Sequence, residues 1–311
     1  MKHKKNEYDI DKLIEKLYSC KPLKSKELIF IIEKSKEIIS KENNVLEVQC
    51  PITICGDIFG RFHNLVELFN LGGRIPYTNY IFMGNYINKG YYSIETLSLL
   101  LCLKIRYPKR IYLLRGNHEC SQYSIIYGFY DECIRKYGYP GIYNYFIDLF
   151  KYFPLAALIE GKILCLHSGL SPSIKTIDDI KLINRVQDDY WEDDIFLGLL
   201  YNEPGDCSWF TPYSKGSGYI FGENISKEFC RVNGLDLIVR GSCYIPKGYK
   251  LMHDNKVCSI CSSPNAYYRN DNEGAIMEVD ENKNYNFYQF DCAPRRGKTE
   301  LMEKTPDCFY D

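Results

Sequence analysis

The chain has 311 residues, of which 45% are hydrophobic and 25% are charged, and its formal net charge at pH 7 is -1. This composition supplies enough apolar material for a full core. A charge so close to zero excludes a nucleic-acid binder that works by neutralising many phosphates. We find no signal peptide, and no apolar run approaches the roughly 18 residues that a membrane helix needs. We therefore expect no nucleic-acid partner and no membrane partner.

The cysteines indicate a reducing compartment. The chain has 14 of them, and most lie inside apolar segments, as Cys55, Cys102 and Cys165 do. Cysteine behaves there as a small apolar residue, so we expect an intracellular protein of the cytoplasm or the nucleus. Cys258 and Cys261 have the spacing of a zinc-binding pair. Because a second pair is lacking, core packing is favoured over a zinc site.

The predicted elements alternate between helices and short buried strands. Residues 9–42 carry two amphipathic helices, the second beginning near Ser25 as a cap. Residues 94–105 repeat apolar side chains at helical spacing, and residues 125–153 are also predicted to be helical. Short apolar runs that end at glycine or polar residues predict buried strands. These runs are 52–55, 80–83, 111–114, 163–166, 235–239 and 257–260.

Polar side chains follow five of the predicted strands. Asp57, Asn85, His167 and Ser242 each follow one strand, and Asn117 with His118 follows another. The carboxyl ends of strands in open α/β sheets are where sites are usually found. Oxygen and imidazole ligands suit hard or borderline divalent metals, so the pattern predicts a metal-binding pocket. The alternative is that these residues only cap loops.

Six blocks of sequence resemble the phosphoprotein phosphatases. They are CGDIFGRFHNLVELF (55–69), MGNYINKGYYSIETL (83–97), LLRGNHECSQYSIIYGFYDECIRKYG (113–138), CLHSGLSPSI (165–174), RGSCYIPKGY (240–249) and SSPNAYYRNDNEGAIMEVD (262–280). The resemblance extends from about residue 8 to the end of the chain. The ending, YQFDCAPRRGKTELMEKTPDCFYD, is similar to that of the catalytic subunits of protein phosphatase 2A.

The resemblance implies a fold and a chemistry. The fold is α+β of the αββα type, a central β-sandwich flanked by helices. A single phosphatase-like domain would cover residues 1–311, with N-terminal helices at 9–42, a catalytic-type core at 46–290 and a tail at 291–311. In the family, two divalent metals (Mn, Fe or Zn) activate water that attacks phosphoserine or phosphothreonine.

The family's metal ligands are only partly present. The positions that correspond to them are Asp57, Phe59, Asn85, Asn117, His167 and Ser242. Phe59 and Ser242 stand where the family has histidine, and Asn85 stands where it has the aspartate shared by both metals. We therefore expect that Asp57, Asn85, Asn117 and His167 hold one metal ion weakly, or none.

The residues for proton transfer and phosphate binding are also altered. His118 occupies the position of the family's proton donor, but Asn88 replaces its aspartate partner, so His118 is expected to be a weakened donor. Lys89 and Lys215 replace two phosphate-binding arginines, and lysine lacks the bidentate fork of arginine. Arg115 is retained as a candidate phosphate ligand, with a strand-end ion pair as the alternative.

These changes predict a phosphatase-like protein that is inactive or strongly impaired and that acts by binding a scaffold or a partner. A helical-repeat scaffold, regulatory subunits of the phosphatase 2A type and a phosphoprotein are the expected partners. The tail ends Cys308, Phe309, Tyr310, Asp311, without the family's terminal leucine, which places tail-dependent assembly in doubt. One alternative is an active serine/threonine phosphatase with an altered metal centre. Another is phosphopeptide binding through Lys89, Lys215 and Arg115.

Overall fold

The computed structural model describes residues 8–188, 193–213, 218–241, 244–266 and 272–293. The helices of these residues are α1 (Ile10–Tyr18), α2 (Ser25–Ile39), α3 (Phe62–Gly72), α4 (Ser93–Arg106), α5 (Ser121–Ile126), α6 (Phe129–Tyr137), α7 (Gly141–Phe150), α8 (Ile177–Lys181), α9 (Asp194–Tyr201) and α10 (Glu223–Asn233). The strands are β1 (Val45–Val48), β2 (Ile52–Cys55), β3 (Tyr80–Phe82), β4 (Ile111–Leu113), β5 (Ala156–Ile159), β6 (Ile163–Leu166), β7 (Glu203–Pro204), β8 (Phe210–Pro212), β9 (Tyr219–Phe221), β10 (Leu237–Arg240), β11 (Tyr249–Met252), β12 (Val257–Ile260), β13 (Gly274–Val279) and β14 (Tyr285–Phe290).

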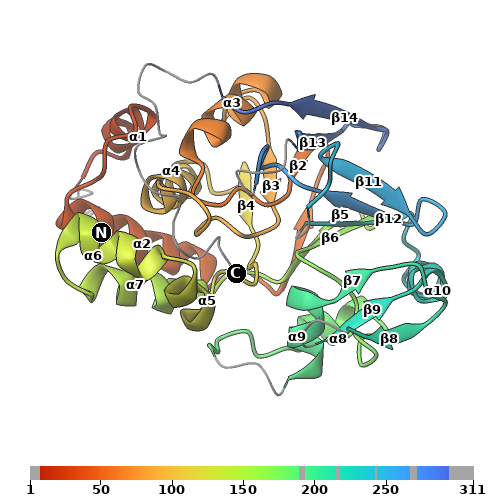
Figure 1. The fold of residues 1–311 in the computed structure, drawn as a ribbon. Helices are drawn as coiled ribbons and strands as arrows, with labels where there is room; N and C mark the ends of the chain where they lie inside the picture. Colours follow the sequence, from red (N-terminus) through yellow and green to blue (C-terminus); the bar gives the residue numbers. More distant parts are fainter. Residues whose placement is uncertain (1–7, 189–192, 214–217, 242–243, 267–271, 294–311) are drawn as a thin grey trace, which may run out of the picture.

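Two sheets form the centre of the molecule, with helices on both flanks (Figure 1). One sheet has six strands in the order β1-β5-β6-β10-β12-β11, and the other has five in the order β14-β13-β2-β3-β4. A small sheet of β7, β9 and β8 lies beside α9 (Figure 1). This arrangement confirms the predicted α+β sandwich. All six predicted strands are present, with bounds that differ by no more than two residues.

Alternate residues of each central strand serve two different cores. In β6, Ile163 and Cys165 pack between the two sheets, in a cluster that also contains Ile54 of β2. Leu164 and Leu166 pack instead against the helices that cover the six-stranded sheet. Successive side chains of a strand point to opposite faces, so a strand buried on both faces must be apolar throughout. This requirement explains the short continuous apolar runs in the sequence.

Helices α1, α2 and α4 pack together over the outer face of the five-stranded sheet. The start of α2 differs in one detail from the expectation. Ser25 is the first helical residue and Lys24 is the cap, and the Glu27 carboxylate accepts the Lys24 N–H at 2.7 Å. A carboxylate three residues into the helix therefore satisfies the open donor, as in a capping box.

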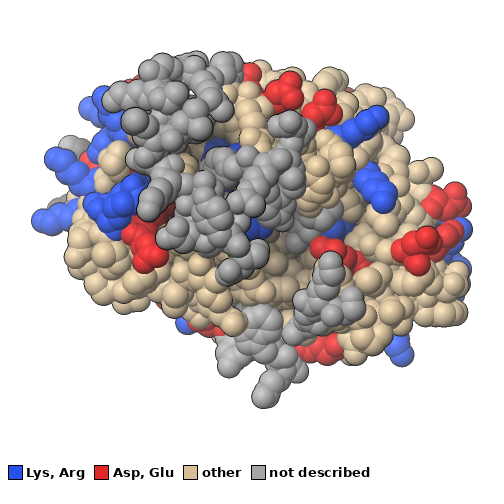
Figure 2. Space-filling model, in the orientation of Figure 1, with Lys and Arg blue, Asp and Glu red and all other residues tan. Residues whose placement is uncertain are grey.

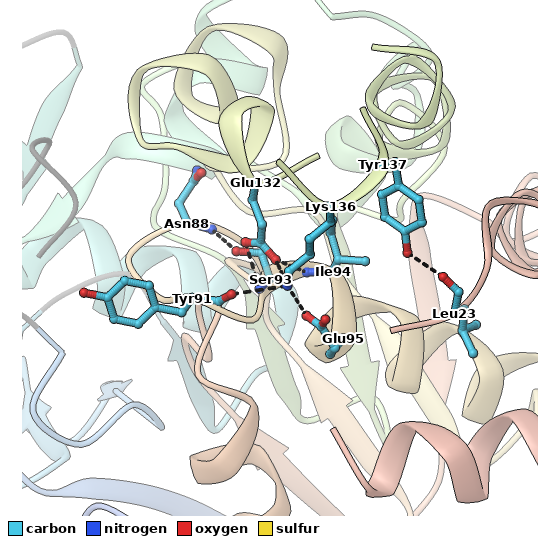
Figure 3. A network of polar contacts seen from close by, with 9 residues as sticks. All are labelled: Leu23, Asn88, Tyr91, Ser93, Ile94, Glu95, Glu132, Lys136 and Tyr137. Carbon is cyan, nitrogen blue, oxygen red and sulfur yellow. Dashed lines mark hydrogen bonds and ion pairs between the residues drawn. The ribbon is translucent and has the colours of Figure 1, made fainter. Parts of the chain in front are cut away.

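Figure 3 shows how the loop after β3 is attached to helix α6. The Glu132 carboxylate of α6 accepts the N–H groups of Ser93 and Ile94, each at 3.1 Å. These are the first residues of α4, whose N–H groups have no partner within their own helix. The Ser93 hydroxyl accepts the N–H of Asn88 at 3.1 Å. Glu132 thus fixes the start of α4 and, through Ser93, the position of Asn88.

A buried ion triad surrounds Glu132. The Lys136 ammonium donates to Glu132 at 2.7 Å and to Glu95 at 2.6 Å, and the two carboxylate side chains are only 4% and 2% exposed. Burial raises the pKa of Glu95, although Lys136 opposes this effect. Burial alone would lower the pKa of Lys136, but the two carboxylates raise it above its ordinary value. The two carboxylates therefore stabilise the ammonium charge of Lys136 in this buried place.

Charges of both signs are interspersed on the described part of the face in Figure 2, in line with the near-zero net charge. Among the described residues, each helix is too short or too polar to cross a membrane.

Replacing Glu132 by alanine is expected to lower the free energy of unfolding by about 3 kcal/mol, because the change leaves Lys136 in a buried site with one carboxylate fewer and opens two N–H groups of α4. Urea denaturation followed by circular dichroism measures the change. The matched control is Glu228→Ala, which removes an exposed carboxylate paired with Arg231 on α10 and is expected to leave the midpoint almost unchanged. Equal midpoints for both variants would contradict the structural role of Glu132.

Candidate functional site

The ends of several strands meet at one edge of the sandwich, as predicted. β2, β3 and β4 are parallel neighbours, and β6 is parallel to β10, so their carboxyl ends lie on common edges. Asp57, Asn85, Asn117 and His167 follow four of these strands. The side chains of Asn85 and Asp57 are in contact, and so are those of His167 and Asn117. The structure therefore brings these four predicted site residues together in two pairs.

The backbone at this edge is unusually crowded. A Cβ atom on Gly84 would lie 2.4 Å from the N atom of Gly116, and Gly84 has a positive φ of 105°. Only glycine fits such an approach. The loop after β3 therefore lies directly against the loop after β4.

Glu119 joins these two loops. Its fully buried carboxylate accepts the backbone N–H groups of Asn85 at 2.7 Å, Tyr86 at 2.9 Å and Gly116 at 3.0 Å. Burial raises the pKa of Glu119 to about 7, and the three N–H donors oppose this rise. The sequence prediction assigned no role to Glu119. The only indication in the sequence that Glu119 belongs to the site is its position directly after Asn117 and His118.

Asp57 and Asn85 are held together by a hydrogen bond. Asn85 Nδ2 donates to Asp57 Oδ2 at 3.0 Å, and both side chains are buried. Asn85 Oδ1 accepts the backbone N–H of His118 at 3.0 Å. Because a backbone N–H can only donate, the Asn85 oxygen must face His118, and the NH2 group must face Asp57. In this arrangement the NH2 group, which cannot bind a metal, faces Asp57, and metal binding by Asn85 stays a prediction.

Phe59 occupies one of the positions where the family has a metal-binding histidine, and its side chain carries no ligand atom. Its ring lies edge-on to the His118 ring, with centroids 5.5 Å apart. The Lys89 ammonium lies 4.5 Å from the centroid of the same ring, which is a cation–π distance. The Phe59 ring thus contacts both the predicted phosphate ligand Lys89 and the predicted proton donor His118.

Asn117 and His167 keep the geometry of two ligands that face one point. His167 Nδ1 lies 2.7 Å from the Met83 carbonyl and donates to it, so the lone pair of the neutral ring is on Nε2. Nε2 lies 3.2 Å from Asn117 Oδ1. Burial lowers the pKa of His167 to about 4, although Asp57 and the Met83 carbonyl oppose this. At neutral pH, two acceptor atoms therefore face each other.

His118 and Asn88 are also in contact, as the family pattern predicts. Asn88 Nδ2 lies 2.8 Å from His118 Nδ1, and both residues are buried. Burial holds the pKa of His118 well below its ordinary value, and the positive charge of Lys89 and the neighbouring His167 lower it further. The imidazole is therefore neutral at physiological pH.

Arg115 is fully buried and lies at the base of the loop after β4. Its guanidinium donates to the carbonyl oxygens of Glu119 at 3.2 Å, Arg185 at 3.3 Å and Gln187 at 2.9 Å. These contacts tie distant loops together, and phosphate binding by Arg115 stays a prediction. Lys215 and Ser242 lie outside the described residues.

The described residues do not fit a two-metal centre. A bridging carboxylate presents oxygen to both ions, whereas Asn85 presents an N–H group to Asp57 and its oxygen to a backbone N–H. Asp57, Asn117 and His167 still offer oxygen and nitrogen donor atoms, which suit a single divalent ion.

A row of tyrosines beside His118 was not assigned to the site from the sequence. The rings of Tyr123 and Tyr127 are stacked at 5.5 Å, and Tyr201 lies 5.8 Å from Tyr123. The His118 ring lies 5.2 Å from that of Tyr127. The spacing of four residues between Tyr123 and Tyr127, directly after the Asn117–His118 loop, was the available signal. These rings restrict the orientation of His118.

Comparisons with known proteins agree with this architecture. The family model described as calcineurin-like phosphoesterase matches residues 50–241. A protein serine/threonine phosphatase from Saccharomyces cerevisiae, with similarity to human phosphatase PP5, is 30% identical and has a TM-score of 0.86; the match covers 92% of this chain and 97% of that chain. A cold-active protein-tyrosine phosphatase from a Shewanella species is 15% identical with a TM-score of 0.58, covering 81% and 84% of the two chains. The last likeness shows the fold alone.

The family model spans more than half of the chain, and the yeast phosphatase matches nearly all of it at 30% identity. The chain therefore belongs to the calcineurin-like phosphoesterases, and its type is that of the serine/threonine phosphoprotein phosphatases.

Proposed function

We propose that this protein is a pseudophosphatase, a phosphatase-like chain that hydrolyses phosphoproteins very slowly or not at all and acts by binding partners. One observation carries the proposal, which is the hydrogen bond from Asn85 Nδ2 to Asp57 Oδ2 at 3.0 Å. In the family, the residue at position 85 is the anion shared by two dications. Here the side chain at this position is neutral and donates a hydrogen bond to the Asp57 carboxylate. It therefore presents positive N–H groups where the family presents a negative charge.

Asparagine at positions 85 and 88 fits the backbone conformation of the loop but lacks the negative charge that the family's reaction needs. Asn85 and Asn88 have positive φ values of 57° and 68°, a backbone region that Asn and Asp tolerate better than most residues. Replacing aspartate by asparagine therefore keeps the loop conformation while removing a negative charge. Clustered carboxylates without cations repel one another, and the amides relieve this repulsion.

The phosphate-binding side of the site supports the same proposal. Lys89 offers a point charge where the family has a planar fork. Its ammonium lies over the Phe59 ring. Such a site can attract a phosphoryl group without orienting it for in-line attack, which favours binding over turnover.

The proposed partners are of two kinds. A phosphoprotein is the partner that the remaining cationic groups would recognise. A helical-repeat scaffold or regulatory subunits of the phosphatase 2A type are the partners that the resemblance implies. The residues that change the tail, Cys308 to Asp311, lie outside the described residues. We place the protein in the cytoplasm or nucleus because its described cysteines are free thiols and most are buried.

A second candidate function is an active phosphatase with one metal ion. The contact between Asn117 Oδ1 and His167 Nε2 favours it, because two acceptors at 3.2 Å are stabilised by a cation that both can reach. Asp57 lies at the same edge and would supply the negative charge. The two candidates differ in metal content and in rate.

The purified protein is expected to contain less than one Mn, Fe or Zn ion per chain and to hydrolyse a phosphothreonine peptide at least about 10³-fold more slowly than an intact relative. The loss of the bridging charge, of a ligand and of the acid's partner each costs at least about 10-fold. Elemental analysis and a phosphate-release assay measure both quantities, with the yeast phosphatase purified in parallel as the control. Two ions per chain with ordinary turnover would refute the proposal, and one ion with turnover would establish the second candidate.

Restoring the family's residues is expected to restore catalysis. The variant combines Phe59→His, Asn85→Asp, Asn88→Asp, Lys89→Arg, Lys215→Arg and Ser242→His. It is expected to bind two ions and to gain at least about 100-fold in turnover, because the shared carboxylate and the missing ligands are present again. The control adds Asp57→Asn to the same variant and should abolish the gain. A folded six-site variant that stays inactive would show that the loss does not lie at these positions.

A further inference from the structure

The side chain of Asn88 has three polar neighbours, and the hydrogen-bonding roles of two of them are fixed because they are backbone groups. Its Oδ1 accepts the backbone N–H of Phe129 at 3.1 Å. Its Nδ2 lies 3.3 Å from the carbonyl oxygen of Tyr123 and 2.8 Å from His118 Nδ1. The amide therefore links the starts of helices α5 and α6 to the predicted site.

The orientation of this amide follows from the two backbone groups. The N–H of Phe129 can only donate, and the carbonyl of Tyr123 can only accept. A rotated amide would place its NH2 group against an N–H and its oxygen against a carbonyl oxygen, which loses both hydrogen bonds in a buried place. The NH2 group of Asn88 must therefore face His118, and His118 Nδ1 must accept.

We propose that Asn88 is a positioning residue that holds His118 as a neutral imidazole with its proton on Nε2, so that His118 serves as a hydrogen-bond donor to an oxygen-bearing ligand and not as a proton donor. An imidazolium carries protons on both nitrogens, and its Nδ1–H would meet the N–H of Asn88 at 2.8 Å. An aspartate at position 88 would accept from Nδ1–H and favour the opposite arrangement.

The surroundings of His118 leave Nε2 as the functional atom. The residue is only 4% exposed, and its hydrogen bond to Asn88 uses Nδ1, which leaves Nε2 free of hydrogen bonds to other residues in the described part of the chain. The rings of Phe59, Tyr123 and Tyr127 lie within 5.7 Å of its ring, which restricts rotation. Nε2 is not among the fully enclosed unpaired polar atoms of the described residues, so an N–H at this position can reach an oxygen acceptor that enters the site.

The class of this acceptor is a phosphoryl oxygen, an assignment that rests on the proposed function. Lys89 contacts the Phe59 ring that also contacts His118, so a positive charge lies near the imidazole. A neutral N–H donor and a nearby ammonium together suit an anionic oxygen. Neither group gives up a proton in this mode, so the ligand is held and not cleaved.

The tautomer is measurable without any ligand. Two-bond ¹H–¹⁵N correlation spectra of ¹⁵N-labelled protein separate a protonated ring nitrogen from an unprotonated one, and loss of signals in His118→Gln identifies His118 among the five histidines. At neutral pH, His118 Nδ1 is expected at the unprotonated position and Nε2 at the protonated one. In Asn88→Asp the two positions are expected to exchange. The control Asn286→Asp makes the same charge change on the exposed face of β14 and should leave His118 unchanged.

A protonated Nδ1 in the wild-type protein would overturn the inference. This measurement on the wild-type protein does not depend on whether Asn88→Asp folds. Inorganic phosphate is then added to the labelled wild-type protein, and a shift of the His118 ring signals is expected. An unprotonated Nδ1 that does not respond to phosphate would overturn the phosphoryl assignment and leave the tautomer established. The tautomer is measured before phosphate is added. A wrong tautomer is therefore distinguishable from a failure of phosphate binding, which is the part that rests on the proposed function.

Discussion

The site depends on one buried carboxylate that binds backbone and not metal. Glu119 accepts three backbone N–H groups from the loops after β3 and β4, and every substitution in those loops other than proline keeps these donors. The loops therefore keep their positions without a cation between them. This arrangement explains how a metallophosphatase fold persists where the described ligands no longer fit two ions. The positions of the loops depend on backbone hydrogen bonds to Glu119, whereas any chemistry at the site depends on other side chains of the same loops.

Two amides stand at positions where the family resemblance implies carboxylates, and each of them donates a hydrogen bond where a carboxylate would accept one. Asn85 donates to Asp57, and Asn88 donates to His118. In both cases the orientation of the amide is set by a backbone N–H that must donate to its oxygen. We propose that at these two positions hydrogen bonds within the protein stand in place of the contacts that carboxylates would make.

Much of this could be predicted from the sequence, and the limit has a physical cause. The apolar runs at 52–55 and 163–166 predicted strands because strands buried on both faces must be apolar throughout. The polar residues that follow them predicted the site because parallel strands end at one edge. The direction of the Asn85 amide was not predictable, since it depends on the N–H of His118 in the loop after β4. The strands β7, β8 and β9 have two or three residues each, too few for a periodic signal.

The left-handed backbone at positions 85 and 88 has an evolutionary consequence. Asparagine and aspartate are nearly equal in shape and accept this conformation alike, so exchange between them changes charge without disturbing the chain path. A duplicated gene could therefore lose catalytic activity through single substitutions that leave the fold unchanged, while the surface of the protein still binds the same partners. The reverse exchange, from asparagine to aspartate, is equally neutral for the fold, so a descendant of such a gene can regain the carboxylates that catalysis needs.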